Sequence, residues 1–135
     1  MSQISYTLLI HSPVLSYSGN PVRVDVFGGN TQNLHTVSSS ANNFIGRIYI
    51  EGTIATSPTE NDWFPIYLTS GTSYRQYPVN STIPTGTNQG DTRTEGFTFR
   101  ANLLYIRARI DRSHLNATSY DQTIHGSINS ILLNT

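Results

Sequence analysis

Apolar and polar residues alternate along several short segments of the chain. The clearest case is residues 104–111, where aliphatic side chains at the even positions alternate with tyrosine, arginine and aspartate at the odd positions. Val22–Val26 has the same pattern, with three valines separated by Arg23 and Asp25. Because successive side chains of a strand project to opposite faces, each segment predicts a strand with one buried side and one exposed side.

Six further segments combine β-branched or aromatic residues with flanking glycine, proline, asparagine or serine, which predicts strands separated by turns. They are Ile4 to Ile10, Phe44 to Ile54, Trp63 to Thr69, Ser73 to Val79, Gly96 to Arg100 and Ile124 to Leu133. No segment has a helical period. About eight strands without intervening helices predict an all-β fold, an antiparallel β-sandwich of jelly-roll type, formed by one domain over residues 1–135.

The composition agrees with an all-β fold. Ala, Glu and Lys together number 8, whereas the β-branched residues Ile, Val and Thr number 36. Good helix formers are therefore scarce, and residues that pack well on a pleated sheet are abundant.

Two long segments interrupt the succession of strands. Gly28 to Asn43 and Asn80 to Glu95 are rich in small polar residues and contain few large apolar ones. We interpret both as long loops. Because long loops in a compact domain are often functional, we expect contact surface there.

Charge is sparse and balanced. The chain has 8 basic and 8 acidic residues, 12% charged in all, while Ser, Thr and Asn supply 45 of its 135 residues. All basic residues are arginine, which excludes lysine Schiff-base chemistry, a P-loop lysine and a polybasic membrane tail. A formal net charge of +0 also argues against nucleic acid as a partner.

Targeting signals are not recognisable in the sequence. The first basic residue is Arg23, and no apolar run approaches the roughly 20 residues of a membrane helix. We expect a soluble protein without a signal peptide or a membrane partner. The absence of cysteine is compatible with assembly in the cytoplasm.

Catalytic and metal-binding patterns are weak. Asp111, Ser113 and His114 resemble a hydrolase triad only by proximity, and a turn after a strand explains them equally well. The four histidines lack the close spacing of zinc ligands. The acidic pairs at positions 60/62 and 91/95 fall short of a calcium loop, which leaves at most one loop-bound ion as an alternative. We expect no enzymatic activity, no cofactor and no metal site.

Arginine and tyrosine provide the candidate contact residues. Arg107 and Arg109 share one face of a predicted strand, and we expect them to pair with acidic residues of a neighbouring subunit. Tyr74 and Tyr77 lie close in sequence to Trp63 and are candidates for subunit contacts or for stacking on a glycan. Trp63 begins a hydrophobic run, so a core or subunit-contact role is favoured for it.

Four hydrophobic blocks occur in an order that is similar to a known class of protein. The blocks are Phe44–Ile54, Asp62–Ile66, Phe99–Ala108 and Gly126–Ile128. Over residues 44–133 this order resembles small virion structural proteins of tailed bacteriophages, especially those that infect cyanobacteria. The resemblance implies a non-enzymatic particle component: a capsid decoration protein, or a neck, tail or fibre subunit, assembled in the host cytoplasm and located in the virion.

The resemblance also implies a homo-oligomer whose partners are copies of itself and other virion proteins. A lysine-free chain with few charges suits the burial of large faces against copies, because each desolvated charge needs a partner. We further expect Ile4 to Ile10 and Ile128 to Leu133 to form edge strands that add to a neighbour's sheet. The alternative is a carbohydrate-binding module or host-recognition tip, with Tyr74, Tyr77 and the 80–95 loop around a shallow groove.

Overall fold

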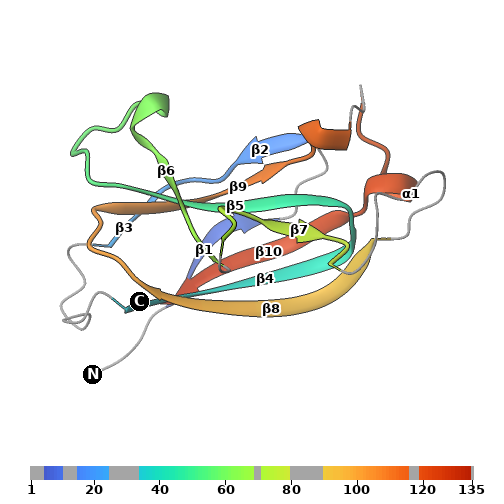
Figure 1. Ribbon diagram of the computed structural model, residues 1–135, viewed down its shortest axis with the longest axis horizontal. Coiled ribbons are helices and arrows are strands. Elements are labelled where there is room, and N and C mark those ends of the chain that lie inside the picture. The colour runs from blue at the N-terminus through green and yellow to red at the C-terminus, as the bar shows by residue number, and fades with distance from the viewer. Residues whose placement is uncertain are drawn as a thin grey trace.

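The fold is a sandwich of two antiparallel β-sheets, as the sequence predicts (Figure 1). It is seen in a computed structural model that describes residues 5–10, 15–24, 34–68, 71–79, 90–115 and 119–134. Between strands the described chain forms only single helical turns, at η1 (Glu60–Asp62), η2 (Ser113–Leu115) and α1 (Gln122–His125). None of its helices is long and apolar enough to cross a membrane.

Ten strands make up the two sheets within the described residues. The four-stranded sheet has the order β1 (Ser5–Ile10), β10 (Ser127–Asn134), β4 (Leu34–Phe44) and β8 (Asp91–Arg100). In the six-stranded sheet, β9 (Tyr105–Asp111) and β5 (Gly46–Thr53) are central, flanked by β2 (Ser16–Ser18), β3 (Val22–Arg23), β6 (Phe64–Ile66) and β7 (Arg75–Tyr77). Both β2 and β3 pair with β9, and both β6 and β7 pair with β5.

The hydrophobic core lies between the sheets and follows the predicted alternation. Ile106, Ala108 and Ile110 of β9 are fully buried, whereas the residues between them belong to the outer face of the sheet. The four-stranded sheet contributes inward-facing residues such as Ile131 and Leu133 to the same cluster. Burial of this apolar area is the main force that holds the two sheets together.

Both segments predicted as long loops turn out to contain strands. β4 occupies most of Gly28 to Asn43, and β8 begins at Asp91, inside Asn80 to Glu95. The loop prediction is wrong for residues 34–43 and 91–95, while residues 28–33 and 80–89 lie outside the described residues. β4 escapes the pattern because its buried face includes His35 and Ser39 alongside its apolar residues, and its other face is polar too.

The two terminal strands pair with each other. β1 is an edge strand, as expected, but β10 lies between β1 and β4 and has hydrogen-bonded neighbours on both sides. The prediction that Ile128 to Leu133 forms a free edge is therefore wrong. The chain ends pair internally because the alternating isoleucine and leucine side chains of β10 fill the middle of the core.

One corner of the sandwich is held by a buried arginine. Arg112 follows β9, and its guanidinium donates from Nε to the Ile45 carbonyl at 2.9 Å and from Nη2 to the Gly126 carbonyl at 3.2 Å. Burial lowers the pKa of Arg112 to about 10, so the side chain stays charged at neutral pH. Gly126 has φ +63° and approaches Asn43 so closely that a Cβ would lie 1.9 Å from the Asn43 carbonyl oxygen.

Candidate functional site

Three of the four predicted contact residues meet on the outer surface of the six-stranded sheet. Tyr74, Arg107 and Arg109 lie there with residues of β5, because the pairing of β5 with β9 sets Tyr49 opposite Arg109 and Glu51 opposite Arg107. We call this surface the arginine–aromatic face. It consists of Arg47, Tyr49, Glu51, Trp63, Tyr74, Arg107, Arg109 and Asp111.

Glu51 is the centre of an ion-pair network on this face. It is buried and accepts hydrogen bonds from Arg107 Nε at 2.8 Å and from Arg109 Nε at 3.2 Å. Arg107 also binds Glu60 through Nη1 at 2.9 Å, and the Arg109 Nη1 donates to Asp111 at 3.0 Å. The hydrogen bond from Arg107 and the charge of its guanidinium hold the pKa of the Glu60 carboxyl below its usual value.

This network corrects the expected role of the two arginines. Arg107 is buried, and both arginines take their carboxylate partners from their own chain rather than from a neighbouring subunit. The cause is the strand register, which brings Glu51 within reach of both guanidiniums although it is more than 50 residues away in sequence.

Each arginine of the face also covers an aromatic ring. The distance from the guanidinium carbon to the ring centroid is 4.4 Å for Arg107 over Trp63, 4.0 Å for Arg109 over Tyr49 and 4.2 Å for Arg47 over Tyr74. The rings of Tyr49 and Tyr74 are 5.6 Å apart. Cation–π contacts of this kind fix the planes of both partners. The face is therefore a preorganised layer of flat groups. Its three arginines are balanced by three carboxylates when Glu60, the partner of Arg107, is counted with Glu51 and Asp111.

An apolar rim borders this sheet at its β6 edge. We use this name for Ile54, Phe64 and Tyr67, which have 67%, 44% and 63% of their surfaces exposed. Trp63, which directly precedes Phe64, is partly buried and lies outside the core cluster, so the core role considered for it is wrong. It covers Arg107 instead. Large apolar side chains exposed along one edge are a feature of binding surfaces.

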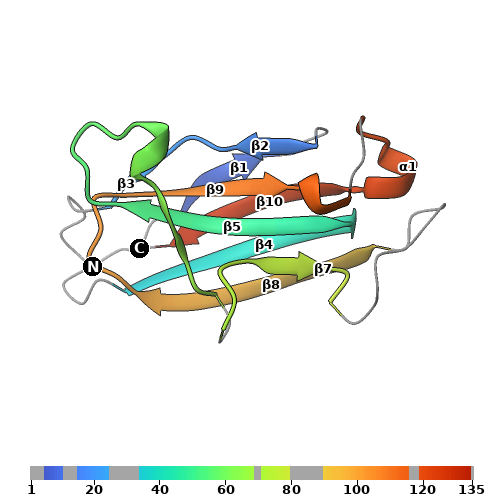
Figure 2. The ribbon, with the colours of Figure 1, turned by 45° about the horizontal axis from the view of Figure 1, so that its top comes forward.

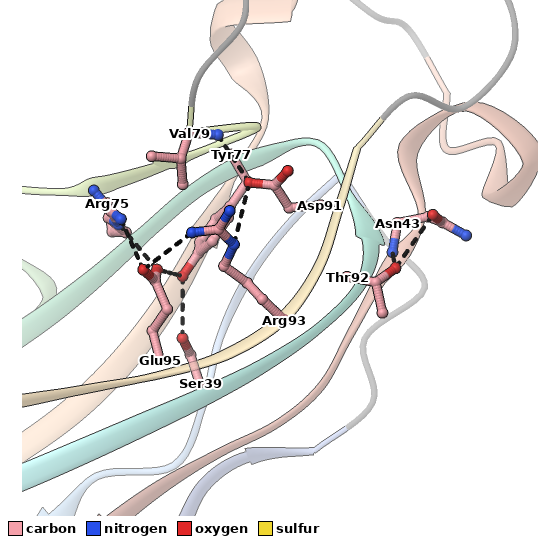
Figure 3. A network of polar contacts seen from close by, with 9 residues as sticks. All are labelled: Ser39, Asn43, Arg75, Tyr77, Val79, Asp91, Thr92, Arg93 and Glu95. Atoms are coloured by element: carbon pink, nitrogen blue, oxygen red, sulfur yellow. Dashed lines mark hydrogen bonds and ion pairs between the residues drawn. The ribbon is translucent and has the colours of Figure 1, made fainter.

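Tyr77, the fourth predicted contact residue, lies in the interior. Its ring packs against Phe44, and its hydroxyl donates to the Glu95 carboxylate at 2.5 Å and lies 3.3 Å from the Ser39 hydroxyl (Figure 3). Burial, followed by the hydrogen bond to Glu95, raises the pKa of Tyr77 to about 12. A groove lined by Tyr74 and Tyr77 is therefore ruled out, since β7 turns Tyr77 toward the core.

Glu95 joins the two sheets at this point. Arg75 of β7 donates to both of its oxygens, at 2.9 and 2.7 Å, across the side of the sandwich where β7 faces β8 (Figures 2 and 3). The hydrogen bond from Arg75 is the largest cause that lowers the pKa of Glu95 to about 2. Arg93 lies 3.5 Å from the same carboxylate and 3.6 Å from Asp91.

The carboxylates considered for a loop-bound ion have protein partners. Asp91 accepts a hydrogen bond from the Val79 backbone at 2.8 Å, and Asp62 caps η1 by accepting from the Thr59 backbone at 2.7 Å. Within the described ranges, no three His, Asp or Glu side chains are placed to hold a metal ion. These carboxylates form ion pairs with arginines or accept hydrogen bonds from backbone amides in turns.

The residues that resembled a triad are arranged as a turn. Asp111 accepts a hydrogen bond from the backbone of Ser113 at 2.8 Å. The two ring nitrogens of His114 are buried and have no hydrogen-bond partner in the part of the chain that the structure describes. Burial lowers the pKa of His114, and the charge of Arg47 lowers it further. The serine–histidine bond that a triad requires is not formed by these residues.

Some residues of the arginine–aromatic face that the sequence analysis did not select could have been found from the alternation of apolar and polar residues. Arg47, Tyr49 and Glu51 alternate with buried Ile48 and Ile50, the same period that identified the odd positions of β9. Glu60 gave no such signal, because η1 reaches Arg107 only after the chain folds back.

Comparisons of the chain with protein-family models, with curated proteins and with solved structures gave no match.

Proposed function

We propose that this protein is a non-enzymatic structural component of a bacteriophage particle, a capsid decoration, neck or tail subunit that acts through protein–protein contacts in the virion. The observation that carries the proposal is the arginine–aromatic face with its apolar rim. Tyrosine, tryptophan, phenylalanine and arginine are the residues enriched in the buried centres of protein interfaces, and lysine is depleted there.

The state of the charged groups on the face also favours binding over chemistry. Glu51 bonds to two arginines, and Arg107 is shared between Glu51 and Glu60. Groups paired in this way can be buried against a protein without leaving an isolated charge. The same pairing offsets the positive charge that a phosphate backbone would require, so nucleic acid is not part of the proposal.

We infer that the sandwich has jelly-roll connectivity, which suits this role. If β2 with β3 and β6 with β7 each count as one interrupted strand, eight strands remain. The first then pairs with the eighth, the second with the seventh, the third with the sixth and the fourth with the fifth. Double Greek-key jelly rolls occur in viral capsid proteins and in lectins, and the fold alone does not decide between them.

The alternative is a carbohydrate-binding module or host-recognition tip. It is favoured by the rings of Tyr67, which is largely exposed, and Tyr74, which is partly exposed. Sugar rings stack on such side chains, and nearby hydroxyl and amide groups can hydrogen-bond to the sugar.

Light scattering of the purified protein, followed by a glycan array on the same sample, tests the proposal. We expect a multiple of 15.0 kDa and no glycan signal. The double substitution Phe64→Ser with Tyr67→Ser should lower the mass, because it removes two of the three side chains of the apolar rim. Tyr17→Ser is the matched control, since Tyr17 is 45% exposed but lies on β2 at the opposite edge of the sheet. A 15.0 kDa monomer that binds glycans through Tyr67 would establish the alternative.

A further inference from the structure

The outer face of the four-stranded sheet differs in character from the arginine–aromatic face. We call it the hydroxyl face, and its residues follow from the strand registers. They are Ser5, Thr7, Leu34, Thr36, Ser38, Ser40, Thr94, Gly96, Thr98, Arg100, Ser130, Leu132 and Asn134. Among these residues, Arg100 at the end of β8 carries the single charge.

The hydroxyl groups of this face bond to one another across the strands. The hydroxyl oxygens of Thr36 and Thr98 are 2.9 Å apart, within hydrogen-bond distance, and the Thr94 hydroxyl donates to the Ser40 hydroxyl at 3.2 Å. Polar groups that already have partners lose less on desolvation than unpaired ones. The face can therefore be covered by another surface although it is polar.

Gly96 lies in the middle of this face, and nothing in the described part of the chain requires it to be glycine. Among the described residues, a Cβ at this position would meet only the Val37 carbonyl oxygen, at 3.9 Å, and the backbone does not have positive φ. Glycine weakens the interior of a strand, and it often marks a place where a ligand or a second backbone approaches closely. The described part of the chain supplies no such neighbour at Gly96, which makes a second chain the candidate.

The size and charge of the face suit a second copy of the same chain. In a two-fold contact the same surface of each copy faces the other, so a face with many charges of one sign would repel its copy. The hydroxyl face carries one charge, Arg100 at the end of β8. With about 4.8 Å between strands and about 3.3 Å per residue, four strands of the length of β10 cover about 500 Å². Two copies would bury about 1,000 Å² in total, the lower limit for a specific interface.

We propose that two copies of this chain associate through their hydroxyl faces, packed sheet against sheet around Gly96 and Ser38. Leu34 and Leu132, both exposed on the face, supply the apolar contacts. The inference deepens the proposed function by naming the partner of this face, and it rests on that function for its place in a particle.

Charge substitutions at Ser38 test the contact. Ser38 is central, opposite Gly96 on one side and Leu132 on the other. The experiment uses the Phe64→Ser, Tyr67→Ser protein, in which both aromatic side chains of the apolar rim are removed, so that association through the rim is weakened. We expect this parent protein to be a dimer. Ser38→Arg and Ser38→Glu should each convert it to a 15.0 kDa monomer, with a dimer dissociation constant at least tenfold larger. Mixing the two variants should restore the dimer, because the opposite charges then face each other.

Gly96→Thr provides a second test that does not depend on charge. A threonine fills open space within the chain and favours the strand, so the melting temperature of the diluted monomer should stay the same or rise. The dimer should nevertheless dissociate, because the added side chain separates the two sheets. Asn61→Arg is the control for the charge substitutions at Ser38, since it adds charge to an exposed residue of η1 and should leave the dimer intact.

Three results would overturn the inference: a monomeric parent protein, a dimer that persists with Ser38→Arg, or binding of the hydroxyl face to insoluble polysaccharide in place of a second copy. The proposed function fails on different results, a glycan signal from a monomer with the intact apolar rim. An oligomer that resists the Ser38 substitutions but is lost with the rim substitutions would overturn this inference and leave the proposed function standing.

Discussion

At the scale of single residues, two polar side chains, the partly buried Glu95 and the buried Arg112, connect elements of the fold. Glu95 bonds to Arg75 and Tyr77 and so ties β8 to β7. Arg112 ties the end of β9 to the backbones of Ile45 and Gly126. In each case the side chain spans elements that are distant in sequence, and removing it leaves a buried group without its partner.

Glu95→Gln should make the free energy of unfolding less sensitive to acid pH. The folded pKa of Glu95, about 2, lies below the ordinary value of 4.5, so its contribution to stability is complete above pH 4.5 and is lost as the pH falls toward 2. At pH 7 we expect the substitution to cost about 1.5–3 kcal/mol, the range for hydrogen bonds to a charged group. Urea unfolding of both proteins from pH 2 to pH 7 measures this, and a difference that does not shrink in acid would contradict the assignment.

Tyr77→Phe isolates the buried hydroxyl from the ring. The phenylalanine keeps the contact with Phe44 but leaves Glu95 and Ser39 with one hydrogen-bond partner fewer. We expect a loss of about 1–3 kcal/mol in the free energy of unfolding. Tyr17→Phe, at an exposed position, should leave that free energy unchanged. Equal effects of the two substitutions would show that the buried network does not stabilise the fold.

At the scale of elements, the ladder between β5 and β9 depends on its buried carboxylate. Among the described residues, Glu51→Gln leaves the buried Arg107 with the exposed Glu60 as its one carboxylate partner, and we expect it to cost about 3–5 kcal/mol, as for other broken buried ion pairs. Glu60→Gln removes the exposed partner and should have a much smaller effect, because water solvates that position. Thermal melts of the two variants, compared at low and high salt, decide the order of the effects.

How far the sequence predicts an element depends on how its apolar residues are distributed. β9 was predicted with its correct faces because its even positions are aliphatic without exception. β4 was missed because its inward side chains include the polar residues His35 and Ser39, which lie against Phe99 and Tyr77 in the fold. Arg107 and Arg109 were found, but their partner Glu51 could not be assigned, because a strand register is a long-range property that no local pattern encodes.

At the scale of the whole molecule, the two sides of the sandwich are closed in different ways. Where β7 faces β8, the ion pair between Arg75 and Glu95 bridges the sheets. On the other side, where β1 approaches β2, the closure is the close approach of the Gly19 backbone to the Leu8 carbonyl of β1. Gly19 is itself fixed to the six-stranded sheet, because it donates to the Ala108 carbonyl of β9 at 2.8 Å. A side chain at residue 19 would have to displace the backbone of β1.

Gly19→Ala should therefore open this side of the sandwich. Its Cβ would lie 1.9 Å from the Leu8 carbonyl oxygen, a distance that only a shift of the backbone can relieve. Overpacking of this kind costs about 1–3 kcal/mol, and hydrogen exchange should rise in β1 before it rises in β8. Gly96→Ala is the matched control at a monomeric concentration, because a Cβ there finds open space and should leave stability equal or higher. If both variants lost the same stability, the loss would reflect the general effect of replacing glycine. The contact between Gly19 and Leu8 would then not be what joins the two sheets.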